Sequence, residues 1–173
     1  MRHFTFPVLL GLFIGTQAVN ITDLLEALNT TEKIWLKNRT YNIGGHSCVF
    51  SKKMELNETN YTFQQGYKTG GKSVNHTLYA RLGQNGSGDP WMEVSNKSGG
   101  HGLKYSLLYW NGGDKCGILK LHYSGNNHYE VHTWDSQVDK GNSECIKKYD
   151  ELRGESHSYE VYSSSCKSGA NRN

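Results

Sequence analysis

Long runs of one chemical character are scarce in this sequence. The one long apolar run, Phe4–Ile14, is shorter than the ~20 residues that a membrane-spanning helix needs. Lysine and arginine total 19 against 16 acidic residues, and the formal net charge is +3. These basic residues form no stripe of the kind that binds nucleic acid. The sequence therefore predicts no membrane span and no nucleic-acid partner.

The short motifs of common catalytic and metal centres are also missing. There is no Cys-x-x-Cys pair, and the cysteine spacings are too wide and irregular for a structural zinc site. No Ser/His/Asp or Cys/His signature of nucleophilic catalysis is present. His128 and His132 would share one face of a strand, but only Glu130 could complete a metal site there. We therefore predict a protein that is not an enzyme and that holds no metal or cofactor.

Residues 1–18 have the pattern of a secretory signal peptide. Arg2 and His3 precede the apolar run, and Gly15-Thr-Gln-Ala18 supplies small residues at a cleavage site. The alternative, an N-terminal core helix, would need an amphipathic period that this run lacks. We predict a secreted chain in which residues 19–173 form a single domain. A domain of this size buries ~70% of the surface that its unfolded chain exposes.

Four cysteines in a secreted chain predict two disulfides. They are Cys48, Cys116, Cys145 and Cys166. Three pairings are possible, and the spacing alone does not choose among them.

Eight Asn-x-Ser/Thr sequons are the next clear signal, and all of them precede residue 100. In a secreted chain several of them would carry N-glycans. We therefore expect one face or end of the molecule to be coated with sugar, either for solubility or for recognition by lectin receptors. The sequons are at Asn20, Asn29, Asn38, Asn57, Asn60, Asn75, Asn85 and Asn96.

Tyrosine-rich segments separated by glycine and asparagine turns predict an all-β fold with flanking helices. A short helix is expected at 22–28, with Thr22 as its N-cap, and a second at 144–152. Short connections favour an eight-stranded antiparallel up-and-down barrel that is wide enough for one small ligand. A β-sandwich is the alternative. The predicted strands are 33–41, 46–56, 60–67, 73–82, 91–95, 103–110, 116–123 and 128–134, with a closing strand at 159–162.

Side-chain direction follows from the sequons because it alternates along a strand and a glycosylated asparagine must face solvent. If Asn60, Asn75 and Asn96 face outward, their alternate neighbours face inward unless a bulge intervenes. These residues would either line a ligand cavity or simply fill the barrel as core. The predicted ligand-binding residues are Tyr61, Phe63, Leu78, Trp91, Glu93, Leu107, Tyr109, Leu119 and Glu130.

The order of several residues resembles a known family. A signal peptide and a short helix precede a strand with Trp35, a strand with Cys48, and then Cys116, Tyr129-Glu130-Val131, Cys145-x-x-x-Tyr149 and Cys166. This order resembles the tick salivary lipocalins of the histamine-binding protein family over essentially the whole mature chain. The resemblance implies a lipocalin barrel with the C-terminal helix packed on its wall. It also implies the disulfides Cys48–Cys166 and Cys116–Cys145.

The amine-binding members of this family carry a motif from which the chain departs. The motif reads Cys-Asp-aliphatic, then Glu-Leu-Trp, then Cys. Gly117 replaces its Asp and Val131-His132 replaces its Leu-Trp, although Ile118 and Glu130 match. A cationic amine in a desolvated pocket needs carboxylates, for which Glu93 and Glu130 are the candidates.

The resemblance implies a monomeric protein of tick saliva that binds a small host mediator or lipid and suppresses host immune or inflammatory responses. The lost acidic position favours an apolar ligand, which would be a sterol, a fatty acid or an eicosanoid, as in the japanin group of the family. One alternative is a scavenger of histamine or serotonin. Another is a lipocalin whose surface acts on host immune cells or a host receptor.

Overall fold

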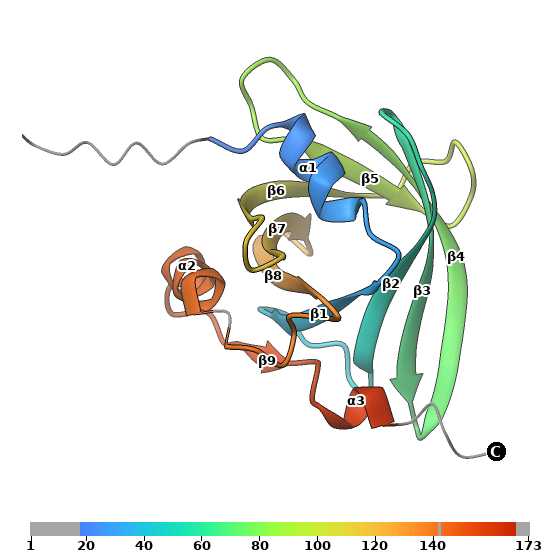
Figure 1. The fold of residues 1–173 in the computed structure, drawn as a ribbon, viewed down its shortest axis with the longest axis vertical. Coiled ribbons are helices and arrows are strands. Elements are labelled where there is room, and N and C mark those ends of the chain that lie inside the picture. The colour runs from blue at the N-terminus through green and yellow to red at the C-terminus, as the bar shows by residue number, and fades with distance from the viewer. Residues whose placement is uncertain (1–17, 142, 169–173) are drawn as a thin grey trace, which may run out of the picture.

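The computed structural model describes residues 18–141 and 143–168, and its main element is a closed antiparallel barrel (Figure 1). All but the last residue of the predicted signal peptide lie outside the described residues. The barrel strands are β1 (Lys33–Arg39), β2 (Ser47–Leu56), β3 (Asn60–Thr69), β4 (Lys72–Gly83), β5 (Trp91–Ser95), β6 (Leu103–Asn111), β7 (Cys116–Tyr123) and β8 (Asn126–Trp134).

The barrel is closed by β1, which pairs with β8 along most of its length and with β2 at Lys33–Trp35. The other strands follow one another in chain order, as short connections predict. Where β2 has diverged from β1, the two-residue strand β9 (Tyr159–Glu160) takes its place and pairs with Asn38 and Arg39. The predicted eight-stranded barrel is confirmed, and the β-sandwich alternative is wrong.

The helix α1 (Ile21–Leu28) covers one end of the barrel (Figure 1). Asn20 caps it, not Thr22 as predicted: the Asn20 side chain accepts from the backbone N–H of Thr22 and Asp23, and Asp23 accepts from the N–H of Asn20. The reciprocal bonds start the helix one residue before Thr22. Leu24 and Leu28, one turn apart, are buried in the barrel core at 1% and 7% exposure. We call this end the closed end.

The C-terminal part of the chain packs on the outside of the barrel wall. Helix α2 (Ser143–Arg153) places Tyr149 against Ile118 of β7 and Val131 of β8, all fully buried. The disulfide Cys116–Cys145 joins α2 to β7, and Cys48–Cys166 joins the short helix α3 (Ser165–Ser168) to β2. The two disulfides are therefore the pair that the resemblance implied.

Trp35 anchors the segment between β8 and α3. Its ring is 2% exposed and packs against Val138 and Tyr162, while its Nε1 donates to Asp135 Oδ1 at 2.6 Å.

Among the residues that the structure describes, no helix has the length and apolar character needed to cross a membrane.

Candidate ligand-binding site

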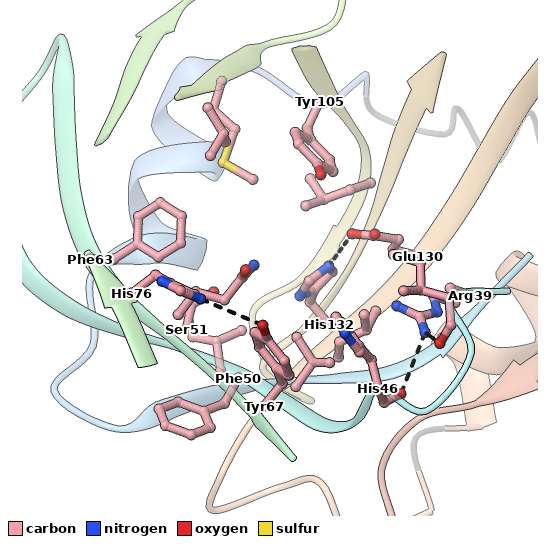
Figure 2. Close-up of a pocket in the computed structure, with 18 of the residues that line it drawn as sticks. Arg39, His46, Phe50, Ser51, Phe63, Tyr67, His76, Tyr105, Glu130 and His132 are labelled. Atoms are coloured by element: carbon pink, nitrogen blue, oxygen red, sulfur yellow. Dashed lines mark hydrogen bonds and ion pairs between the residues drawn. The ribbon is translucent and has the colours of Figure 1, made fainter. Parts of the chain in front are cut away.

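A cavity of about 320 Å³ lies inside the barrel, at the end opposite α1 (Figure 2). We call this end the open end; the loop between β1 and β2 and the turn between β3 and β4 lie there. One part of the lining is apolar and includes Ile34, Leu36, Phe63, Met92, Val94 and Leu119. The other part is polar and includes Arg39, Tyr41, His46, Gln65, Tyr67, His76, Glu130 and His132.

Glu130 is the buried carboxylate of this cavity. Its side chain is 5% exposed, His132 Nε2 donates to its Oε2 at 2.7 Å, and the Tyr41 hydroxyl donates to its Oε1. Burial alone would raise the pKa of Glu130, but the bonds from His132 and Tyr41 and the charge of Arg39 outweigh it and hold the pKa below its usual range. Burial and the adjacent carboxylate raise the pKa of Tyr41, which therefore stays a donor. Glu130 is thus ionised and already has two donors.

Arg39 supplies the opposite charge, at 4% exposure. Its Nη2 donates to the carbonyls of Ile43 and His46 at 3.3 and 3.5 Å, and its guanidinium lies 5.0 Å from the centre of the Tyr41 ring. Its Nε is buried and has no hydrogen-bond partner among the described residues. The cavity therefore contains a buried cation with spare donor capacity.

Arg39 was missed by sequence reasoning, although a signal for it was present. Asn38 belongs to a sequon, and the alternation rule that placed Tyr61 inward would place Arg39 inward as well. The structure agrees because a register shift between Leu36 and Asn38 turns Arg39 to the same side as Leu36.

Histidine and tyrosine rings line the rim of the cavity (Figure 2). The His46 ring stacks on Tyr67 with centroids 4.2 Å apart, and the Tyr67 hydroxyl lies 3.5 Å from His76 Nε2. With His132, three histidines line the cavity. None of them belongs to a group of three or more metal-ligating side chains among the described residues. The rim therefore offers hydrogen-bonding groups and ring faces.

A second cavity of about 50 Å³ lies deeper in the barrel, next to α1. Leu24, Leu28, Tyr61, Leu107, Trp110 and Trp134 line it. It shares Ile34, Ser51, Phe63, Met92, Leu119 and His132 with the larger cavity, so the two spaces adjoin.

Most of the predicted ligand-binding residues lie inside the barrel. Phe63 and Leu119 line both cavities, Tyr61 and Leu107 the smaller one, and Glu130 the larger one. Leu78 packs, partly buried, against the core cluster without lining either cavity. That these side chains bind a ligand stays a prediction.

Trp91 and Glu93 face outward, so their predicted inward direction is wrong. The alternation was carried back from Asn96, which lies beyond the end of β5 at Ser95. Met92 and Val94 take the inward positions instead. On the outer face Glu93 pairs with Arg81 at 2.5 Å and His101 at 3.1 Å; these hydrogen bonds lower its pKa to about 2.

Tyr109 also faces away from the cavities, contrary to the prediction. A bulge between Leu107 and Tyr109 in β6 reverses the alternation, so Leu107 faces the core and Tyr109 packs with Tyr149 and Ile118 on the outer wall. The next residue, Trp110, turns inward in its place.

Comparison with known proteins agrees with the barrel. The family model described as tick histamine binding protein matches residues 16–168. The chain belongs to this family. A comparison with curated proteins found no match.

Solved structures show the same lipocalin fold in proteins of low sequence identity. AM182 in complex with serotonin has a TM-score of 0.65 and 17% identity, covering 83% of this chain and 91% of that one. Japanin from Rhipicephalus appendiculatus bound to cholesterol has a TM-score of 0.54 and 11% identity, covering 71% and 87%. The siderocalin Ex-FABP has a TM-score of 0.57 and 9% identity, covering 80% and 95%. The family and its fold neighbours are ligand-binding lipocalins.

Proposed function

We propose that this tick lipocalin is a secreted salivary protein that binds an amphipathic lipid in its barrel and thereby suppresses host inflammation. The ligand would be a fatty acid or eicosanoid, with its acidic head beside Arg39 and its apolar body along Phe63, Met92 and Leu119. The observation that carries the proposal is the buried Arg39, whose Nε has no partner among the described residues, next to an apolar wall.

The charges of the larger cavity favour an acid over an amine. Glu130 is the only carboxylate among its lining residues, and it already accepts from His132 and Tyr41. An amine cation would have to share Glu130 with the buried Arg39, which repels it. A carboxylate head would instead give Arg39 the partner that its Nε lacks, because charge-assisted bonds to arginine are among the strongest in proteins.

The size and apolar lining of the cavity suit a small amphipathic molecule. Ligand sites are mostly apolar clefts of roughly 300–1,000 Å³ with a few polar groups that orient the ligand. The cavity of about 320 Å³ has this composition, with the polar groups at the open end. The protein would suppress inflammation by binding the mediator stoichiometrically at the bite, without a catalytic step.

A biogenic amine is the second candidate, and Glu130 is the observation that favours it. The carboxylate is ionised and lies inside the cavity, and the neighbour AM182 was solved with serotonin. Amine binding would require the ammonium group to displace His132 from Glu130.

Calorimetric titration of the deglycosylated protein tests the two candidates. We expect arachidonic acid to bind more tightly than its methyl ester, and histamine and serotonin to bind weakly. Arg39→Gln should weaken binding of the acid by about tenfold or more, because a bond to a charged group is lost, and should leave the ester unchanged. Arg81→Gln, on the outer face, is the matched control. Submicromolar amine binding without acid binding would overturn the lipid proposal.

A further inference from the structure

Two buried donors, on side chains that line the smaller cavity, have no hydrogen-bond partner among the described residues. The Tyr61 hydroxyl and Trp110 Nε1 are both sealed from solvent and make no hydrogen bond. Both side chains line the cavity next to α1, and Tyr61 is only 1% exposed. The third such donor in the lining, Trp134 Nε1, donates to the carbonyl of Ala27 at 2.9 Å. Of the three tyrosine and tryptophan donors on side chains that line this cavity, one is therefore paired and two are unpaired.

Buried polar groups are almost always hydrogen-bonded, so two unpaired donors in one cavity indicate an absent acceptor. Burial raises the pKa of the Tyr61 hydroxyl, so this group remains a donor at any physiological pH. An indole N–H can only donate. The missing partner must therefore be an acceptor, and an oxygen atom fits both groups.

The lining also shows that the acceptor is uncharged. His132 and Tyr61 are the only ionisable side chains among the described residues that line this cavity. His132 already faces the carboxylate of Glu130. A charged group would find no counter-charge there and would be costly to bury. The volume of about 50 Å³, against about 320 Å³ for the larger cavity, suits one small group.

The cavity can be reached by a ligand that occupies the larger one. Phe63, Met92 and Leu119 line both spaces, so an apolar chain running along them from the open end leads to Tyr61 and Trp110. We propose that Tyr61 and Trp110 form a subsite for one uncharged oxygen, a hydroxyl or a carbonyl, on the tail of the bound lipid. The inference rests on the function proposed above and narrows the ligand to oxygenated acyl chains.

A series of matched ligands tests the subsite. Stearic acid is compared by calorimetry with C18 acids that carry a single hydroxyl or keto group at successive positions along the chain. We expect one short range of positions to bind about tenfold more tightly than stearic acid, because a polar ligand group then pairs donors that are otherwise unpaired. Positions outside that range should bind more weakly than stearic acid, since they would bury an unpaired oxygen.

Variants then assign the effect to the two donors. Tyr61→Phe keeps the ring and removes the hydroxyl, so it should abolish the preference for the oxygenated acid over stearic acid. Trp110→Phe should reduce the same preference. Tyr109→Phe, on the outer wall, is the matched control and should retain it.

The outcomes separate this inference from the function that it extends. Equal binding of all C18 acids, with the effect of Arg39→Gln intact, overturns the subsite alone and indicates that water fills the cavity. A preference that survives Tyr61→Phe also overturns the subsite. Failure of every acid to bind overturns the lipid function and the subsite together.

Discussion

The two ends of the barrel are built from the same eight strands but are stabilised in opposite ways. At the closed end, α1 buries Leu24 and Leu28 against an apolar core. At the open end, buried Arg39 and Glu130 lie among hydroxyl and imidazole groups. Apolar burial stabilises a fold wherever it occurs, whereas buried charges recover their desolvation cost only through well-placed partners. Apolar packing of α1 therefore stabilises the closed end, whereas the open end retains charges that stability alone would not select.

Five of the eight sequons lie around the closed end. Asn20, Asn29, Asn57, Asn60 and Asn85 are all exposed and lie around the closed end, beside α1 or in the connections between β2 and β3 and between β4 and β5. Glycans on these residues would surround the closed end, whereas a glycan on Asn75, which is exposed near the turn between β3 and β4, would lie toward the open end.

The largest expected effect tests the closed end. Leu24→Ala should lower the free energy of unfolding by about 3 kcal/mol, because it removes a fully buried side chain from the contact between α1 and the core and leaves a cavity. Chemical denaturation measures the loss. Leu103→Ala, at 43% exposure, is the matched control and should change the same quantity by about 0.5 kcal/mol or less. An equal loss of unfolding free energy in both variants would contradict the view that the packing of α1 against the core stabilises the fold.

A smaller effect is expected at the open end. Glu130→Gln should lower the free energy of unfolding by about 2 kcal/mol, because it weakens two hydrogen bonds and leaves the buried Arg39 without an opposing charge. Since the pKa of Glu130 is lower in the folded chain than in the unfolded chain, its contribution is present above the usual carboxyl range and is lost as the pH falls below it.

Denaturation at a series of pH values between 7 and 3 therefore checks Glu130. The wild type should lose stability more steeply than Glu130→Gln as the pH falls, so that the two curves converge at acid pH. Parallel curves would mean that Glu130 contributes no pH-dependent stability. Glu55→Gln, at an exposed position of β2, is a control that should follow the wild type.

The smallest effect concerns a single sequon that lies between the two ends. Asn38 is half-buried between β8 and β9, and its Nδ2, the atom to which a glycan is attached, donates to Ser158 Oγ at 3.4 Å. We expect folded, secreted protein to carry no glycan at Asn38. Peptide mass spectrometry after enzymatic deglycosylation in ¹⁸O-labelled water checks this, with the exposed Asn85 as the comparison. A glycan found on Asn38 in folded protein would show that β9 does not cover it.

Much of the fold could be predicted because its signals are local. Turn residues and apolar alternation placed all eight barrel strands, and β5 and β7 begin and end where predicted. The errors arose where geometry departs from a simple period of two. Tyr109 was misplaced by a bulge, and Glu93 by an alternation that was carried past the end of its strand. Neither departure has a local signature in the sequence.

The candidate site was predicted less completely because it depends on contacts between distant segments. Glu130 was identified from its own motif, but its partner Tyr41 is 89 residues away in the chain. The unpaired donors of Tyr61 and Trp110 depend on which side chains surround them, so no sequence pattern could show them.

The pairing of β9 with β1 also means that glycosylation of Asn38 depends on when it occurs relative to folding. Ser158 follows Asn38 by 120 residues, which take about 6–24 s to synthesise at roughly 5–20 residues per second. Throughout that interval the sequon has neither its covering strand nor Ser158, so an oligosaccharide could be attached to it. A chain modified then would meet β9 with its pairing edge obstructed. The fraction of molecules that carry a glycan at Asn38 thus reports the rate of glycosylation relative to the rate at which β9 pairs with β1.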